Sequence, residues 1–523
     1  MNGHQIRQQE WTRRQLILSG ASLAALPWLG RQTLAAGPSR VLRFADNPFT
    51  LGVASGDPTS DGMVLWTRLA PDPLHGGGLP AENFDVKWEL AEDDSFSRIV
   101  QRGSEVASPA MGHSVHVELR GLEPDRWYWY RFMSGDFVSP TGRTKTMPAA
   151  NVIPDRLKLC FASCQHYETG LFTAYEHMAH ENPDLVLHLG DYIYEYEGKD
   201  NRVRKHSGPE ITTLEHYRNR HAQYRMDSAL QNMHALCPWL VVWDDHEFDN
   251  NCAGAISEER GVSTEDFLLR RANAYQAYYE NMPLRKPAIP RGSDMLLYRT
   301  IDVGGLARIA MLDTRQYRSD QPNGDGNKPL TGAALDPQTT MLGTAQESWL
   351  LNQLSASKAR WNVLGQQVMM ARVDRIPGED RRFSMDQWAG YDVARRRLLT
   401  ELAERRIANP VVLTGDIHSN WVNDLLVDFD RPTDPIVATE FVGTSISSGG
   451  NGTQKAVGHA LLMSENPFVK FQNSERGYVS CEITAKEWRS RYQVVEYVDR
   501  PAAPLVTRAT YVVETGRPGA KPV

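Results

Sequence analysis

The sequence contains few cysteines, and their spacing shows no regular pattern. Their number is odd, five in 523 residues, and they are Cys160, Cys164, Cys237, Cys252 and Cys481. Small secreted domains that depend on disulfides carry many cysteines in an even, closely spaced set, so that class is excluded. At least one thiol therefore remains unpaired and is available for another role.

Long hydrophobic runs and blocks of basic residues are also missing. The apolar stretch at 16–29 is too short and too often interrupted by Gly and Pro to span a membrane, and no later stretch is long enough. Lys and Arg form no block after the first residues, which argues against a nucleic-acid-binding surface. The net charge of -7 attracts no anion at long range, so affinity for one must come from bound cations in a site.

The N-terminus has the order of regions found in a signal peptide. Arg13 and Arg14 precede the apolar stretch, and small residues follow up to Ala36. The twin arginine predicts export by the twin-arginine machinery, which carries folded cargo and is often used when a cofactor is inserted first. We expect a mature periplasmic or extracellular chain that begins near Gly37 and has no transmembrane segment. An amphipathic first helix with two chance arginines is the alternative.

Residues 40–150 are predicted to form a small all-β domain. Short runs at 62–67 and 85–90 are bounded by Gly, Pro and Asp turns, and aromatic residues alternate with others at 122–132. This pattern is typical of a fibronectin- or immunoglobulin-like sandwich. The region contains no cluster of catalytic residue types, so we expect it to pack against the domain that follows or to shield it.

The chain beyond residue 150 alternates predicted strands and helices, which indicates an α/β fold with helices on both faces of a sheet. Buried-strand runs occur at 157–162, 185–191, 239–245, 361–366 and 410–416, and helical stretches lie between them, for example at 215–225 and 267–281. The expected segments are a twin-arginine signal peptide at 1–36, an N-terminal β-sandwich domain at 40–150, an α/β domain at 155–505 and a C-terminal tail at 506–523.

Each predicted strand ends in a polar residue that can bind a metal. These residues are Cys164, Asp191, Asp245, Gln366, Asp416 and His418. In open α/β sheets the ligand crevice lies at the carboxyl ends of the strands, so residues far apart in sequence are brought together there. A single Asp at a strand end is commonly a turn former. A mixture of Cys, Asp, Gln and His at successive strand ends is hard to explain by turns, and it predicts one site.

The softer donors suit a transition metal. Cys164 offers a thiolate, Tyr194 a phenolate and His418 an imidazole, and phenolate in particular suits a ferric ion. Asp191 lies three residues before Tyr194, so both can reach one ion from one loop. A buried structural thiol and a hydrogen-bonded structural histidine are the alternatives for Cys164 and His418.

The remaining donors offer only oxygen. Asp245, Gln366 and Asp416 suit Ca²⁺, and Mg²⁺ or Mn²⁺ less well. Asp191 carries two carboxylate oxygens and could bridge both ions. A two-metal site clamps phosphoryl oxygens and lowers the pKa of bound water or oxide, which suits the hydrolysis of phosphate esters.

Longer motifs surround these residues. They are Phe161-Ala162-Ser163-Cys164-Gln165, Leu189-Gly190-Asp191-Tyr192-Ile193-Tyr194-Glu195-Tyr196, Trp243-Asp244-Asp245-His246-Glu247, Leu312-Asp313-Thr314-Arg315-Gln316-Tyr317-Arg318, Gly415-Asp416-Ile417-His418 and Glu440-Phe441-Val442-Gly443-Thr444-Ser445. Over nearly the whole mature chain the sequence resembles the PhoD-type alkaline phosphatases of the calcineurin-like metallophosphatase superfamily. The resemblance implies a four-layer β-sandwich flanked by helices as the catalytic domain, after a small all-β domain.

The resemblance also implies Fe³⁺ and Ca²⁺ as cofactors and assigns roles to residues. The residues that match the iron ligands are Cys164, Asp191, Tyr194 and His418, and those that would serve calcium are Asp191, Asp245, Gln366 and Asp416. By analogy with the superfamily, His246 would contact phosphate or protonate the leaving oxygen. Asn250 and Asn251 lie close enough in the sequence to compete with Asp245 for the metal.

The expected function is that of a secreted alkaline phosphatase. It would hydrolyse phosphate monoesters and diesters with a metal-activated water or oxide at an Fe/Ca site. One alternative is a phospholipase D-like phosphodiesterase on the same site. The other is an exported binding protein with a structural metal, although the sequence has no Cys₄ or Cys₂His₂ pattern to support it.

Overall fold

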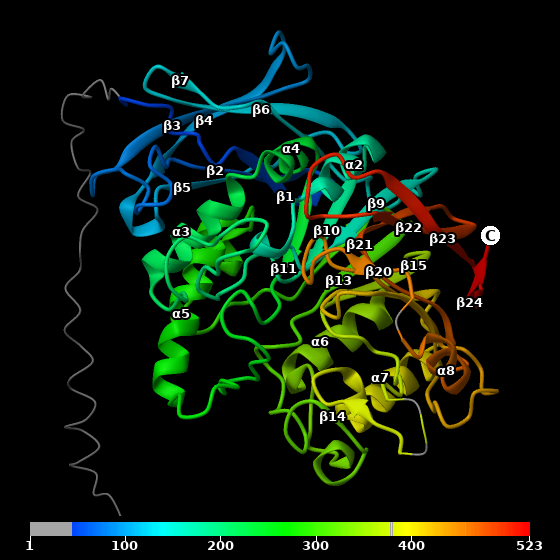
Figure 1. Ribbon diagram of the computed structural model, residues 1–523. Coiled ribbons are helices and arrows are strands. Elements are labelled where there is room, and N and C mark those ends of the chain that lie inside the picture. Colours follow the sequence, from blue (N-terminus) through cyan, green and yellow to red (C-terminus); the bar gives the residue numbers. More distant parts are fainter. Residues whose placement is uncertain (1–43, 377, 379, 456) are drawn as a thin grey trace, which may run out of the picture. The chain divides into compact units, whose positions relative to one another are not determined.

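The computed structural model describes residues 44–376, 378, 380–455 and 457–523 (Figure 1). The expected signal peptide at 1–36 lies outside the described residues. Among those residues, the structure contains no helix of sufficient length and apolar character to cross a membrane.

The N-terminal region contains two groups of antiparallel strands. One group consists of β3 (Phe84–Ala91), β4 (Ile99–Ala107), β6 (Trp127–Ser134), β7 (Phe137–Val138) and β8 (Gly142–Lys145). In β6 every second side chain is buried, including Tyr128, Tyr130 and Phe132, as the alternation in the sequence predicts.

The other group consists of β1 (Val53–Thr59), β2 (Gly62–Arg68) and β5 (Ser114–Glu118). It is continuous with the sheet that follows, because Gly56 of β1 pairs in parallel with Trp239 of β11. The N-terminal strands are therefore joined to the α/β region by backbone pairing as well as by side-chain packing. The domain boundary near residue 150 stays a sequence prediction.

Two large sheets form the centre of the fold. The first continues from β1 through β11 (Trp239–Val242), β10 (Leu185–Leu189), β9 (Leu157–Ala162), β21 (Val469–Ile483), β22 (Glu487–Val495), β23 (Leu505–Glu514) and β24 (Arg517–Pro522). The second contains β12 (Arg299–Val303), β13 (Ala307–Met311), β15 (Trp361–Gln366), β17 (Pro410–Thr414), β19 (Ala438–Val442) and β18 (Asn420–Leu425), and β18 pairs with the first part of β21. The long strand β21 thus belongs to both sheets.

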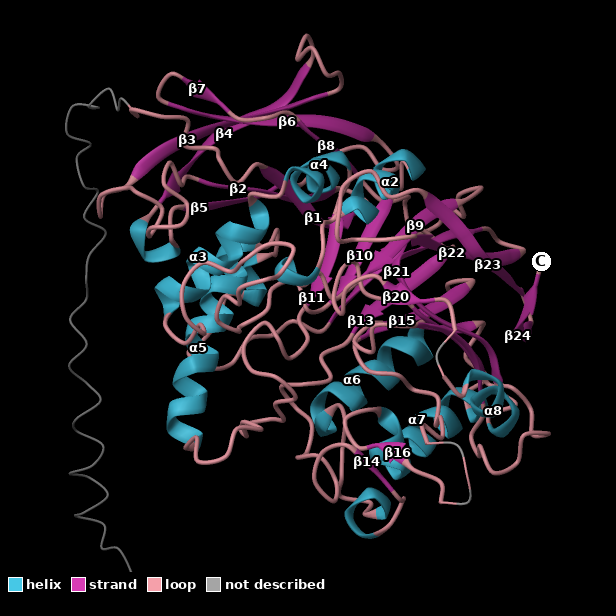
Figure 2. Ribbon diagram, viewed as in Figure 1, coloured by secondary structure: helices cyan, strands magenta, loops and turns pink. Residues whose placement is uncertain are grey.

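Helices cover the outer faces of the two sheets. The α-helices are α2 (Thr173–Glu181), α3 (Leu214–Arg225), α4 (Ser228–Leu236), α5 (Thr264–Asn281), α6 (Gly343–Ala356), α7 (Asp392–Glu404) and α8 (His459–Glu465). The minor elements are β14 (Asn327–Lys328), β16 (Phe383–Ser384), β20 (Gly452–Thr453), η2 (Pro109–Met111), η3 (Tyr167–Thr169), η4 (Lys286–Ala288), η5 (Gly332–Leu335) and η6 (Trp388–Tyr391). Figure 2 shows α2 and α4 on one side of the strands and α6 and α7 on the other.

Side chains of β17 alternate between two faces of the sheet, and this alternation explains the four layers. Val411 and Leu413 pack in the cluster that contains Leu187 of the first sheet. Val412, between them, points the other way and packs with Leu350 of α6. The order of layers is therefore helix, sheet, sheet, helix, which confirms the expected fold class.

The last residues of the chain form strands of the first sheet, so the prediction of a C-terminal tail is wrong. Residues 506–523 were expected to form a tail, but they lie in β23 and β24, which extend the first sheet beyond β22. Tyr511 and Val513 are buried in the main core cluster. The segment is part of the sheet because its apolar side chains complete the core and its backbone covers the edge of β22.

Candidate metal centre

The predicted site residues follow parallel strands that end at the same edge of their sheets. Strands β9, β10 and β11 run parallel to one another, and so do β13, β15 and β17. Cys164 follows β9, Asp191 follows β10, Asp245 follows β11, and Asp416 and His418 follow β17. The strand order thus brings these loops together, as expected for the carboxyl ends of parallel strands.

The backbone turns sharply at the site residues. The φ angles of Cys164, Asp191, Asp416 and His418 are 58°, 53°, 63° and 51°, in the left-handed region that non-glycine residues rarely occupy. Strained backbone of this kind is typical of functional sites held by a rigid surrounding structure. The turn at each strand end directs the side chain toward the space shared by the loops.

Two glycines allow the loops to approach each other closely. A Cβ atom at Gly190 would lie 2.3 Å from Asp244 Cβ, and the φ of Gly190 is 107°. A Cβ atom at Gly415 would lie 2.8 Å from Ser163 Cβ. Each Gly-Asp motif therefore needs its glycine for close approach and presents its aspartate to the site.

The softer donors lie together. Sγ of Cys164, a carboxylate oxygen of Asp191 and a ring nitrogen of His418 are all within 4.8 Å of one another. The Tyr194 hydroxyl donates a hydrogen bond of 2.8 Å to Asp191 Oδ2 and lies 3.2 Å from His418 Nε2. All the residues predicted for a ferric-like ion are thus neighbours.

The environment of these donors fits a multivalent cation. Burial, and then the Asp191 carboxylate, raise the pKa values of the Cys164 thiol and the Tyr194 phenol well above their usual range. Burial also raises the pKa of Asp191, whose Oδ1 atom is buried without a hydrogen-bond partner among the described residues. A cation that binds all of these donors would stabilise their deprotonated forms, since metal binding displaces protons from its ligands.

A second group consists of carboxylates around one guanidinium. Oxygens of Asp244, Asp245 and Asp416 lie within 4.8 Å of one another. Arg315 donates hydrogen bonds to Asp244, to Asp416 Oδ1 at 3.1 Å and to Asp386 Oδ1 at 2.9 Å. Oδ2 of Asp244 and Oδ1 of Asp245 are buried and have no hydrogen-bond partner in the described part of the chain. Oxygen donors in excess of the positive charge fit a hard cation.

The structure does not bring Gln366 into this group. Its Oε1 atom accepts from Trp388 Nε1 at 2.7 Å, and its amide donates to Thr414 and to a backbone carbonyl. Gln366 lies two residues after Leu364 in β15, so both side chains are on the same face of the strand. Leu364 faces the helices, and Gln366 therefore points away from the site. Gln387 reaches Asp416 Oδ2 instead, at 2.5 Å.

Asp245 shares its surroundings with the other carboxylates, whereas the amide of Asn250 pairs with a different acid. It belongs to the group with Asp244 and Asp416 and also to one with Asp191 and His246. The Asn250 amide donates to Glu258 at 2.6 Å.

His246 is oriented by an acidic partner. Its Nδ1 atom lies 2.8 Å from Glu195 Oε2, and its ring lies 4.2 Å from the Tyr194 ring, measured between centroids. Burial alone would lower the pKa of His246, but the carboxylates of Glu195, Asp191 and Asp245 outweigh it and raise the pKa well above its usual value. With Nδ1–H donating to Glu195, a protonated ring would carry its second proton on Nε2. The side chain is 12% exposed.

Sequence reasoning missed two residues that organise the site. Glu247 accepts backbone N–H bonds from Asp191, Tyr192 and Asp244, at 3.0, 2.6 and 2.7 Å, and so ties the loops after β10 and β11 together. Arg315 lies at the centre of the carboxylates. Both belong to motifs noted in the sequence. Their roles could not be predicted from residue spacing, because their hydrogen-bond partners come from other loops.

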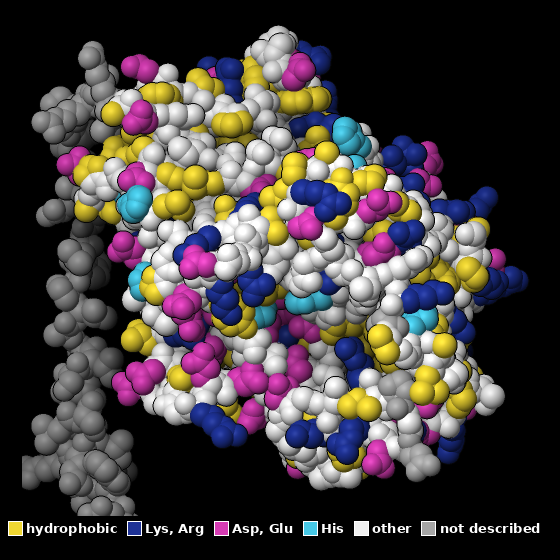
Figure 3. Space-filling model, in the orientation of Figure 1, with side chains coloured by type: hydrophobic (Ala, Val, Ile, Leu, Met, Phe, Trp, Pro, Cys, Tyr) yellow, Lys and Arg dark blue, Asp and Glu magenta, His cyan; other side chains and the backbone are white. Residues whose placement is uncertain are grey.

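Acidic side chains are present near the middle of the face that Figure 3 draws. Asp and Glu side chains lie there beside histidines, with Lys and Arg side chains close by. A substrate that carries negative charge would meet repulsion here without bound cations. The surface therefore agrees with a site whose affinity for anions depends on metal ions.

Comparisons with known proteins agree on one family. A family model described as PhoD-like phosphatase matches residues 159–492, and one described as PhoD-like phosphatase, N-terminal domain, matches residues 35–148. Alkaline phosphatase D of Bacillus subtilis (strain 168) is 51% identical over 485 residues, which cover 92% of this chain and 83% of that protein. A solved structure described as "Structure of PhoD" is 51% identical, covers 92% of this chain and 93% of its own, and has a TM-score of 0.90.

Replacement of Gly190 by alanine tests the close approach of the two loops. The added Cβ collides with Asp244, so we expect a loss in unfolding free energy of about 2–5 kcal/mol, from overpacking and the left-handed backbone together. Gly208→Ala is the control, because Gly208 has a φ of 83° and open space around it. It should cost only about 1–2 kcal/mol for its backbone. Urea unfolding measures both, and equal losses would show that the approach is not tight.

Proposed function

The chain belongs to the PhoD-like phosphatase family, and we propose that it is an exported alkaline phosphatase that hydrolyses phosphate monoesters and diesters with Fe³⁺ and Ca²⁺. Family membership makes it a phosphoric ester hydrolase. The observation that carries the finer proposal is the position of Asp191. Its carboxylate belongs both to the group with Cys164 and His418 and to the group with Asp245 and His246. A bridging carboxylate between softer and harder donors is what a mixed two-metal site requires.

The proposed ferric ligands are the soft donors together with the bridge. They are Cys164, Asp191, Tyr194 and His418. Asp245 and Asp416 would hold calcium with Asp191, and Asp244 is a further oxygen donor beside them. Gln366 is left out of this set, because its amide is engaged by Trp388 and Thr414. When bound, the two cations would neutralise the phosphoryl oxygens and activate the attacking water.

The side chains around the cations would do the remaining work. His246 would donate its Nε2 proton to the leaving oxygen, which otherwise departs as a strongly basic alkoxide. Glu195 positions His246 by holding Nδ1–H. Glu247 and Arg315 hold the carboxylate loops together and so would help to keep the cation ligands in place.

The remaining alternatives differ in how they fit this site. A phospholipase D-like phosphodiesterase would use the same donors and the same proton on His246, so it differs only in the ester it accepts. A binding protein with a structural metal is not favoured, because the family model that matches residues 159–492 is described as a PhoD-like phosphatase.

Substitution of Cys164 by serine tests the ferric ligand set. We expect the purified Cys164→Ser protein to contain at least tenfold less iron and to lose hydrolysis of 4-nitrophenyl phosphate in proportion, because a hydroxyl is a much poorer ligand than a thiolate at neutral pH. Elemental analysis gives the metal content. Tyr194→Phe should remove any phenolate-to-iron absorption in the visible spectrum.

Cys160→Ser is the matched control, since Cys160 lies in the core part of β9, four residues before Cys164. It should retain iron. Full iron and full rate in Cys164→Ser would overturn the assignment, as would undiminished activity after both ions are removed with a chelator.

Replacement of His246 by asparagine tests the proton donor. The rate with butyl phosphate should fall about 100-fold or more, whereas 4-nitrophenyl phosphate, whose leaving group needs no proton, should lose less than about tenfold. His75→Asn is the control, because the His75 side chain is 78% exposed and pairs with Asp72. Equal losses with both esters would exclude the role.

Turnover of the wild-type enzyme with bis(4-nitrophenyl) phosphate and with phosphatidylcholine should also be measured and compared with its turnover of the two monoesters. Faster turnover of both diesters than of either monoester would favour the phosphodiesterase alternative.

Export is supported by the order of regions at residues 1–36. Replacing Arg13 and Arg14 with lysines should keep the protein in the cytoplasm of a host with a twin-arginine pathway, because that route requires the arginine pair. Cell fractionation followed by immunoblotting measures the exported share. Unchanged export of the dilysine variant would contradict the proposed route.

A further inference from the structure

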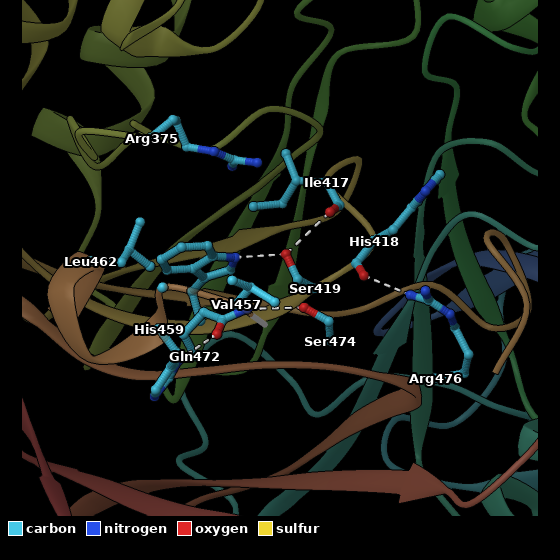
Figure 4. A pocket seen from close by; sticks show the side chains of 12 residues that line it. Arg375, Ile417, His418, Ser419, Val457, His459, Leu462, Gln472, Ser474 and Arg476 are labelled. Atoms are coloured by element: carbon cyan, nitrogen blue, oxygen red, sulfur yellow. Dashed lines mark hydrogen bonds between the residues drawn. The ribbon is translucent and has the colours of Figure 1, made fainter. Parts of the chain in front are cut away.

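A pocket of about 370 Å³ adjoins the metal centre and shares His418 with it (Figure 4). Its volume lies near the lower end of the range of about 300–1,000 Å³ that is typical of small-molecule sites. Ile417, Trp421 and Leu462 supply apolar surface, and Arg375 and Arg476 supply positive charge. The charged side chains of the pocket are thus positive, whereas those of the centre beside it are mostly carboxylates.

Arg375 differs from the other arginines of its segment. Arg372 and Arg381 both pair with Asp430, at 2.5 and 2.7 Å. Arg375 has no carboxylate partner among the described residues, and its guanidinium lies 5.8 Å from the Trp421 ring. Figure 4 shows its side chain extending toward Ile417, across the pocket. Its charge is therefore presented to whatever occupies the pocket.

The backbone that carries Arg375 is held in place. Its N–H donates to the Arg382 carbonyl at 2.9 Å, and Asp374 Oδ1 accepts the Arg382 N–H at 3.0 Å. Asn466, just after α8, accepts the Asp374 N–H at 2.8 Å and donates to its carbonyl. A fixed base lowers the entropy lost when a guanidinium binds an anion.

A second positive charge lines the pocket. Arg476 donates to the His418 carbonyl at 2.6 Å and to the Gly450 carbonyl at 2.8 Å, and it has no carboxylate partner in the described part of the chain. Burial lowers its pKa to about 10, so it stays protonated at neutral pH. It therefore fixes the loop that carries His418 and adds to the positive potential.

Polar side chains complete the wall. Gln472 lies between His459 and Ser474, since its Oε1 is 2.8 Å from His459 Nδ1 and its Nε2 donates to Ser474 Oγ at 2.9 Å. With Nδ1–H as the donor to Gln472, Nε2 of a neutral His459 ring is an acceptor and offers nothing to an anion. The Ser474 hydroxyl accepts from Gln472 and keeps its own proton, which it can donate to an anion paired with Arg375.

We propose that this pocket holds the alcohol part of the substrate and that Arg375 recognises a second phosphate group on it. This inference rests on the proposed function, because the alcohol is placed by the ester bond at the metal centre. The apolar wall would contact the carbon chain, and the guanidinium would bind the second phosphate through paired N–H···O bonds. Arg375 is then a specificity-determining residue that selects esters of anionic alcohols.

The test compares two substrates that differ only in the second phosphate, propane-1,3-diyl bisphosphate and 3-hydroxypropyl phosphate. We expect the wild-type enzyme to have the higher kcat/KM with the bisphosphate. Arg375→Gln should lower kcat/KM for the bisphosphate at least tenfold more than for the monophosphate, mainly through KM, and Arg375→Lys should retain part of the preference.

Arg381→Gln is the matched control, because the Arg381 side chain is 60% exposed and pairs with Asp430 away from the pocket. It should leave the ratio of the two kcat/KM values unchanged. A wild-type ratio near one, or equal losses with both substrates in Arg375→Gln, would overturn the inference alone. If the metal-loaded wild type hydrolyses neither substrate, the proposed function fails with it.

Discussion

The burial of several carboxylates at one edge of two facing sheets governs the rest of the site. Asp191, Asp244 and Asp245 are almost completely inaccessible to solvent. Arg315 pairs with Asp244 and Asp245, and His246 lies beside Asp191 and Asp245. Burying unpaired charge is costly, so such a group either takes up protons or binds cations. Burial raises the pKa of Asp416 to about 6, whereas at Asp245 the charges of Arg315 and His246 outweigh burial and lower the pKa of the carboxyl. Cations would resolve that conflict and give the site its affinity for phosphate.

The fold supplies the rigidity that this arrangement requires. Parallel strands bring the donor loops to one place, and glycines with little room around them let the loops meet. Glu247 then joins two of the loops through three backbone N–H groups. Such support from a second layer of residues is how metal ligands keep their orientation while left-handed backbone is tolerated.

Opposite signs of charge divide the site into two regions. The metal centre is rich in carboxylates, whereas the pocket beside it has Arg375 and Arg476 without carboxylate partners among the described residues. The reacting phosphoryl group and the alcohol part would therefore be recognised by different means, through cations at one end and through guanidinium and apolar contacts at the other. His418 belongs to both regions, and Arg476 holds its carbonyl.

Local patterns in the sequence determined the strands and the residues at their ends. Runs such as 157–162 and 361–366 coincide with β9 and β15, because buried strands are marked by continuous apolar residues. The same patterns placed Cys164 and His418 beside each other correctly, since parallel strands share one edge. Tertiary structure alone decided which amide reaches Asp416: the pleat turns Gln366 toward the helices, and Gln387 arrives from another loop.

Tertiary structure also decided that residues after 505 pair with β22 and that Arg315 lies among the carboxylates. Periodicity reports which side of an element is buried. It carries no information on which distant segment covers that side, and that depends on packing across the whole chain.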